Sequence, residues 1–99
     1  MRHHYLRSEP PASSAHWAIG RNTAGPNTVL IQIGDTKGRQ ARTSNAPADA
    51  NAFAQQLRSV LEFADRMPIT LSKDGETVSI TIHREDGLEM ADAIEAIIG

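Results

Sequence analysis

The stretch that decides the fold is PADANAFAQQLRSVLEFADRM, residues 47–67. Pro47 suits the first turn of a helix, and Asp49 would lie near the positive end of the helix dipole. Pro68 cannot continue a helix. The apolar residues recur at spacings of three and four, which predicts a helix from Pro47 to about Met67 with one apolar face. That face comprises Phe53, Leu57, Val60, Leu61, Ala64 and Met67.

Residues 28–33, just upstream, form the clearest strand and supply a partner for this face. Val29, Ile31 and Ile33 alternate with more polar neighbours, which is typical of a strand with one buried side. Residues 15–21 show the same alternation around Trp17 and Ile19, and the Gly- and Pro-containing turn at 22–27 predicts a hairpin. A short third strand is predicted at 39–43, where arginines suit a sheet edge.

A second hairpin and helix are predicted downstream. Residues 69–72 and 76–83 flank Lys73-Asp74-Gly75, and Asp-Gly favours a tight type I′ turn. The final helix is predicted at about residues 87–98. Its apolar positions are Leu88, Ala91, Ile94, Ile97 and Ile98.

The pattern predicts an α+β fold with the order ββ(β)αββα. We expect a two-layer sandwich in which an antiparallel sheet of four or five strands has two helices on one face. The 99 residues suit a single domain, at 15–99. Residues 1–14 contain Pro10-Pro11 and show no apolar period, so we expect a flexible N-terminal arm.

The amino-acid composition favours an ordinary globular domain and excludes several kinds of site. Hydrophobic residues make up 39% and charged residues 22%, as in ordinary globular domains. Cysteine is absent, which excludes disulfides, thiolate metal sites and a thiol nucleophile. No apolar run is long enough to cross a membrane, and the N-terminus lacks the apolar run of a signal peptide. We therefore expect a cytoplasmic protein without a membrane partner.

No motif predicts catalysis, a cofactor or a metal. The serines occur in neither the Gly-x-Ser-x-Gly nor the Ser-x-x-Lys pattern. Residues 34–38, GDTKG, lack the spacing of a nucleotide-binding loop. His16 and His83 lie on predicted strands without a third metal ligand that the sequence can name. Catalytic residues, a metal site and a cofactor are all predicted to be absent.

Charge is distributed unevenly along the chain. Residues 1–44 carry six Arg or Lys against two acids, whereas residues 74–99 carry one Arg against seven acids. The basic residues Arg21, Lys37, Arg39 and Arg42 precede a predicted helix N-terminus, where free N–H groups favour anions. This arrangement favours, as an alternative function, nucleic-acid binding through phosphate contacts.

The acidic final helix supports the main hypothesis. Glu85, Glu89, Asp92 and Glu95 form a negative face that is predicted to contact a partner. We therefore expect a non-catalytic protein-interaction or regulatory module, acting through a sheet edge or face and this helix. The partner would be another protein or a second copy of the chain, as in a homodimer.

Overall fold

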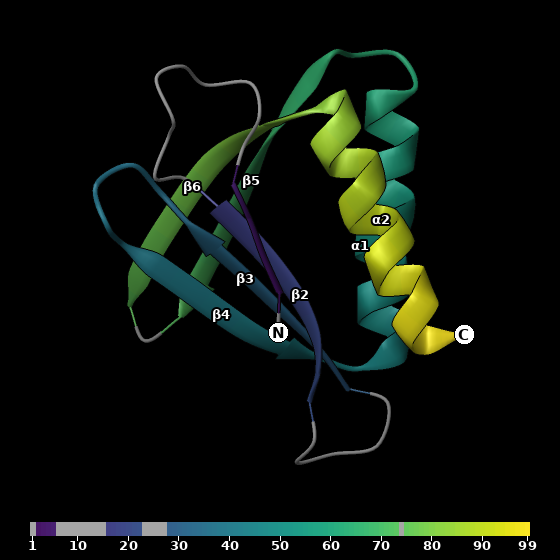
Figure 1. The fold of residues 1–99 in the computed structure, drawn as a ribbon, viewed down its shortest axis with the longest axis horizontal. Coiled ribbons are helices and arrows are strands. Elements are labelled where there is room, and N and C mark those ends of the chain that lie inside the picture. Colours follow the sequence, from purple (N-terminus) through teal and green to yellow (C-terminus); the bar gives the residue numbers. More distant parts are fainter. Residues whose placement is uncertain (1, 6–15, 23–27, 74) are drawn as a thin grey trace.

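The computed structural model of the chain describes residues 2–5, 16–22, 28–73 and 75–99 (Figure 1). Six strands and two helices lie in this part of the chain. In order they are β1 (Arg2–Tyr5), β2 (His16–Asn22), β3 (Thr28–Gly34), β4 (Gln40–Asn45), α1 (Pro47–Leu61), β5 (Arg66–Lys73), β6 (Glu76–His83) and α2 (Arg84–Ile98). The predicted α+β class is therefore confirmed.

The strands form two antiparallel sheets. The larger sheet has the order β1-β2-β3-β4, so each strand pairs with its neighbour in sequence. The smaller sheet is the β5–β6 hairpin, with Ile69 opposite Ile80. Gly75 closes this hairpin with a φ of +82°, a conformation that favours glycine. Asp74, the other residue of the predicted Asp-Gly turn, lies outside the described residues.

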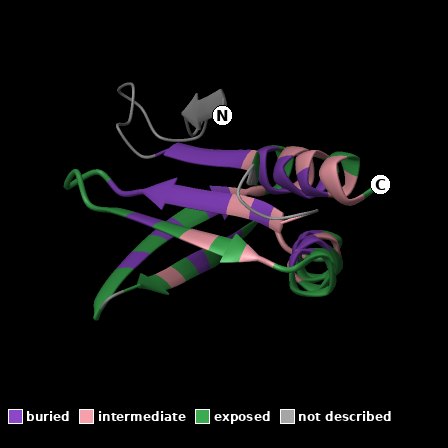
Figure 2. Ribbon diagram, turned by 90° about the horizontal axis from the view of Figure 1, so that it is seen from below, coloured by how far each residue is buried: buried purple, intermediate pink, exposed green. Residues whose placement is uncertain are grey.

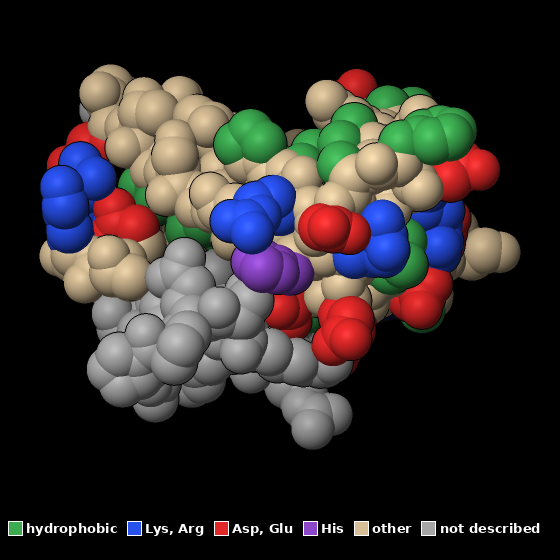
Figure 3. Space-filling model, turned by 90° about the horizontal axis from the view of Figure 1, so that it is seen from above, with side chains coloured by type: hydrophobic (Ala, Val, Ile, Leu, Met, Phe, Trp, Pro, Cys, Tyr) green, Lys and Arg blue, Asp and Glu red, His purple; other side chains and the backbone are tan. Residues whose placement is uncertain are grey.

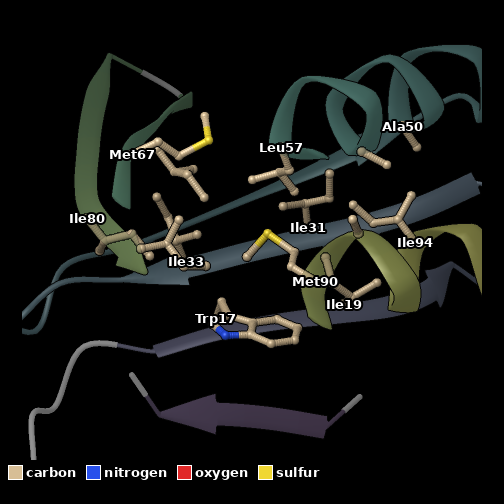
Figure 4. Packing of buried hydrophobic residues seen from close by; sticks show 14 of the residues in the cluster. Trp17, Ile19, Ile31, Ile33, Ala50, Leu57, Met67, Ile80, Met90 and Ile94 are labelled. Carbon is tan, nitrogen blue, oxygen red and sulfur yellow. The ribbon is translucent and has the colours of Figure 1, made fainter. Parts of the chain in front are cut away.

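One apolar interior joins the two sheets and the two helices. Val29, Ile31 and Ile33 alternate toward it from β3, and Trp17 and Ile19 do so from β2. Residues of α1, α2 and the β5–β6 hairpin belong to the same buried cluster, and their side chains converge in Figure 4. The helices cover one part of the larger sheet and the hairpin another, which leaves the outer surfaces of α1 and the hairpin largely exposed (Figure 2). Leu57 and Leu61 of the predicted helix face join Val29, Ile31 and Ile33 in this cluster, as expected. Val60, which was predicted for the same face, is 37% exposed instead.

The prediction of one continuous sheet is wrong, because β5 and β6 form a separate hairpin. Pro68 lies within β5, opposite Thr81 of β6. A proline has no N–H, so it suits a strand side that has no hydrogen-bonded neighbour. β5 forms no ladder with β4, although the two strands lie close together.

The first helix ends at Leu61 rather than near Met67. The chain turns at 62–65 and enters β5, where Met67 is buried in the core and Pro68 is exposed. Met67 therefore matched the helical period by coincidence, since the alternation 67, 69 and 71 belongs to a strand. The predicted strand at 69–72 begins earlier for the same reason.

The second helix begins at Arg84, before the predicted start at Gly87. Glu85 and Asp86 occupy its first turn, where carboxylates favour the positive end of the helix dipole. Gly87 lies inside the helix rather than before it. A Cβ at this position would be 2.1 Å from Leu61 Cδ1 of α1. This glycine allows α2 to approach α1 closely rather than marking a boundary.

The remaining elements differ modestly from prediction. The strands predicted at 15–21, 28–33 and 39–43 are β2, β3 and β4, and the strand predicted at 76–83 matches β6. Within the predicted flexible arm, β1 pairs with β2, with Arg2 opposite Ile19. The rest of that arm and the turn at 23–27 lie outside the described residues.

We predict that Gly87→Ala destabilises the protein by about 1–2 kcal/mol, because overpacking against buried Leu61 outweighs the better helix propensity of alanine. Chemical denaturation measures the change. In a Leu61→Val background, which removes the clashing Cδ1 atom, the same substitution should be neutral or stabilising. An equal loss of stability in both backgrounds would contradict close contact between the helices.

Candidate interaction surface

The acidic face of α2 is partly neutralised by Arg58 of α1. The Arg58 guanidinium donates to Asp92 Oδ1 at 2.5 Å, to Glu95 Oε1, and through Nε to Glu95 Oε2 at 3.3 Å. The hydrogen bonds that Arg58 donates to Glu95 and, to a lesser extent, to Asp92 raise the pKa of Arg58 above its already high ordinary value, so it remains charged. Two of the four predicted partner residues therefore hold the helices together.

The other two predicted acids, Glu85 and Glu89, lie in the N-terminal half of α2. Glu85 is exposed and Glu89 is half-buried. Arg84 precedes them and spans the gap to α1, donating from Nε to Leu61 O at 2.8 Å and from Nη2 to Ala64 O at 3.3 Å. It also pairs with Asp65 at 3.2 Å. Arg84 thus satisfies carbonyl groups where α1 ends and the turn begins.

This early helix end leaves Phe63 in solvent. Phe63 is 86% exposed, and Val60, at 37%, is the other exposed large hydrophobic residue in the described part of the chain. Phe63 N donates to Val60 O, which places both residues at the end of α1. On the side of the molecule where the helices lie, Figure 3 shows exposed hydrophobic side chains next to acidic and basic ones.

A shallow cleft of about 460 Å³ lies where α1 ends and α2 begins, lined by Arg58, Leu61, Glu62, Arg84 and Leu88. It combines apolar groups of both helices with charged groups at its edge. We refer to Val60, Glu62, Phe63, Asp65, Arg84, Glu85 and Leu88 as the helix-end patch. Glu62 forms no ion pair with any residue that the structure describes.

The four predicted anion-binding residues do not form one cluster. Arg21 pairs opposite Val29, whereas Lys37 and Arg39 lie in the turn beyond Gly34, about 17 Å further along the sheet at 3.4 Å per residue. Arg21 Nη2 also donates to Ile97 O at 3.4 Å, near the negative end of α2. Arg42 is exposed on β4, opposite Gln32. Nucleic-acid binding stays a prediction that this arrangement does not favour.

Arg39 instead stabilises the β3–β4 turn through Asp35. One Asp35 oxygen accepts hydrogen bonds from the backbone N–H groups of Lys37 and Arg39 at 2.9 Å, and the other accepts from Arg39 Nε at 2.8 Å. Desolvation raises the pKa of Asp35, but the hydrogen bonds from Arg39 and Lys37 outweigh it and hold the pKa below its ordinary value of 3.8. Asp35 therefore favours the closed turn when it is ionised.

The two strand histidines have separate environments. His16 lies on β2, where its ring packs over Gly34 and its Nε2 is 3.3 Å from Gln32 Nε2. His83 precedes α2 and lies in the other sheet. In the described ranges, no three His, Asp or Glu side chains are grouped as a metal site requires, and no helix could span a membrane.

Phe63 was missed by the sequence analysis. It falls off the apolar stripe that contains Leu57 and Leu61, and an aromatic residue off the buried stripe of a helix is a signal of exposure. Glu62 lies four residues before Arg66, the spacing of a helical ion pair, but Arg66 lies in β5. A correct helix end would have revealed both residues.

No protein family model matches the chain, and no curated protein matches it significantly.

We predict that Asp35→Asn destabilises the protein at pH 7 and that this difference from the wild type shrinks as the pH falls. The folded-state pKa lies below the unfolded value, so the stabilisation is present above pH 3.8 and is lost as the pH falls through the folded pKa. Urea unfolding between pH 7 and pH 2.5 measures the difference. Lys37→Ala is the control, because it retains the backbone N–H and should keep the wild-type pH dependence. Parallel curves for wild type and Asp35→Asn would contradict the role of Asp35.

Proposed function

We propose that this protein is a non-catalytic interaction module that binds another protein through the helix-end patch. The observation that carries the proposal is the exposure of Phe63, at 86%, in a chain whose other described aromatic side chains, Trp17 and Phe53, are at least partly buried. Fully covering a phenylalanine contributes about 1.5–3 kcal/mol, so a partner that covers this ring would gain much of its affinity there.

The polar groups around Phe63 favour a basic partner. Glu62 and Asp65 are exposed acids at this end of the molecule, and Asp65 pairs with Arg84. The nearby cations are already engaged, Arg58 by two carboxylates of α2 and Arg84 by Asp65 and two carbonyl groups. An incoming Lys or Arg would therefore meet net negative charge around an apolar centre, which favours correct partners and faster association.

The acidic residues of α2 have distinct roles in this proposal. Glu85 extends the helix-end patch, and Glu89 lies one turn further along the same helix. Asp92 and Glu95 bind Arg58 of α1 and hold the two helices together. Their contribution to partner binding is therefore indirect, because they fix the relative position of the helices that carry the patch. The partner is a second protein or a second copy of this chain.

Photo-crosslinking in the native host tests the proposal. A benzophenone amino acid at position 63 should give a discrete adduct with one protein, whereas the same group at Thr81, exposed on the hairpin, should not. Adding Glu62→Lys should lower the adduct yield several-fold, because it reverses the charge beside the ring. An adduct of twice the chain's mass would identify the partner as a second copy.

Three results would contradict the proposal: no adduct at position 63, equal adducts at 63 and 81, or a yield that Glu62→Lys leaves unchanged. Phe63→Ser provides the stability control. Because Phe63 is exposed, this variant should unfold at the same urea concentration as the wild type.

A further inference from the structure

A second cleft, of about 300 Å³, is lined by residues of β4, β5 and α1. It lies beside the middle of α1, at Phe53 and Gln56, and so is separate from the patch where that helix ends. It forms because β5 does not pair with β4, which leaves a gap between the two sheets that α1 closes on one side. Its volume is at the lower end of the range of small-molecule sites.

None of the described residues that line this cleft has an ionisable side chain. Ile31, Met67 and Ile69 are buried residues at its base, and Phe53 is half-buried beside them. The polar members are hydroxyl and carboxamide groups from Thr43, Asn45, Gln56 and Thr70. A charged ligand would lose hydration here without gaining an opposite charge, so the lining selects for a neutral one.

Asn45 supplies a directed polar group. Its Nδ2 donates to Val29 O at 3.3 Å, to Thr43 O at 3.2 Å and to Thr43 Oγ1 at 3.0 Å. These contacts fix the orientation of the carboxamide, whose Oδ1 accepts no hydrogen bond from any described residue. Gln56 is exposed at the same cleft and adds a second carboxamide. A bound molecule with a hydroxyl or amide N–H would supply the missing donor.

We propose that the cleft between β4, β5 and α1 binds a small uncharged molecule with an aromatic or branched apolar body and a hydrogen-bond donor. The apolar body would contact Ile31, Phe53 and Ile69, and the donor would reach Asn45 Oδ1. Nothing in this site depends on the helix-end patch or on a protein partner.

Titration with benzyl alcohol, followed by methyl NMR, tests the site. The compound should give saturable shifts in the methyl groups of Ile31, Met67 and Ile69. Benzoate and benzylammonium, which have the same ring with a charge, should bind about tenfold more weakly or less. No saturable shift, shifts confined to other residues, or equal binding of all three compounds would overturn the proposal.

Matched variants separate binding in the cleft from effects elsewhere. Thr43→Phe should fill the cleft and raise the dissociation constant for benzyl alcohol at least about tenfold, whereas Ser44→Phe, exposed on the opposite face of β4, should leave it unchanged. Gln56→Glu keeps the shape of an exposed residue and should shift the preference toward benzylammonium. Equal effects of the two phenylalanine variants, or an unchanged preference in Gln56→Glu, would contradict the site.

Discussion

The packing of three apolar surfaces around Ile31 and Leu57 is the constraint on which the rest of the structure depends. The larger sheet, the helix pair and the β5–β6 hairpin each have one apolar side, and they bury these sides in one cluster. The buried hydrophobic residues in the described part of the chain form this one cluster, so no element there packs against a second core. Hydrophobic side chains that do not fit into this shared interior, such as Phe63, are exposed.

The end of α1 connects the core to the proposed function. Leu61 is the last buried residue of the helix, and a Cβ at position 87 of α2 would lie 2.1 Å from its Cδ1. Arg84 then binds the carbonyl of Leu61, and the chain turns toward β5. This turn places Phe63 outside the core, so the same packing that stabilises the fold exposes the apolar centre of the helix-end patch.

The sequence predicts the class, most elements and the central contact between the 28–33 strand and the first helix. Alternation and helical periods are local signals, and they follow burial closely. The helix end was not predictable in this way, because Met67 fits both the helical spacing from Ala64 and the strand alternation 67, 69 and 71. The division into two sheets was also missed, since strand pairing depends on packing between segments far apart in the sequence. The distance between Arg21 and the pair Lys37 and Arg39 was not predictable either, because it depends on the register of β2 against β3.

A single shared core predicts that the sheet and the helices unfold together. Trp17 is the only tryptophan and is fully buried on β2, so its fluorescence reports on the larger sheet, whereas circular dichroism at 222 nm reports mainly on α1 and α2. Urea unfolding followed by both signals should give coincident transitions with one midpoint. Loss of the helical signal at a clearly lower urea concentration than the change in Trp17 fluorescence would show that the helices do not share the sheet's interior, and it would contradict the account.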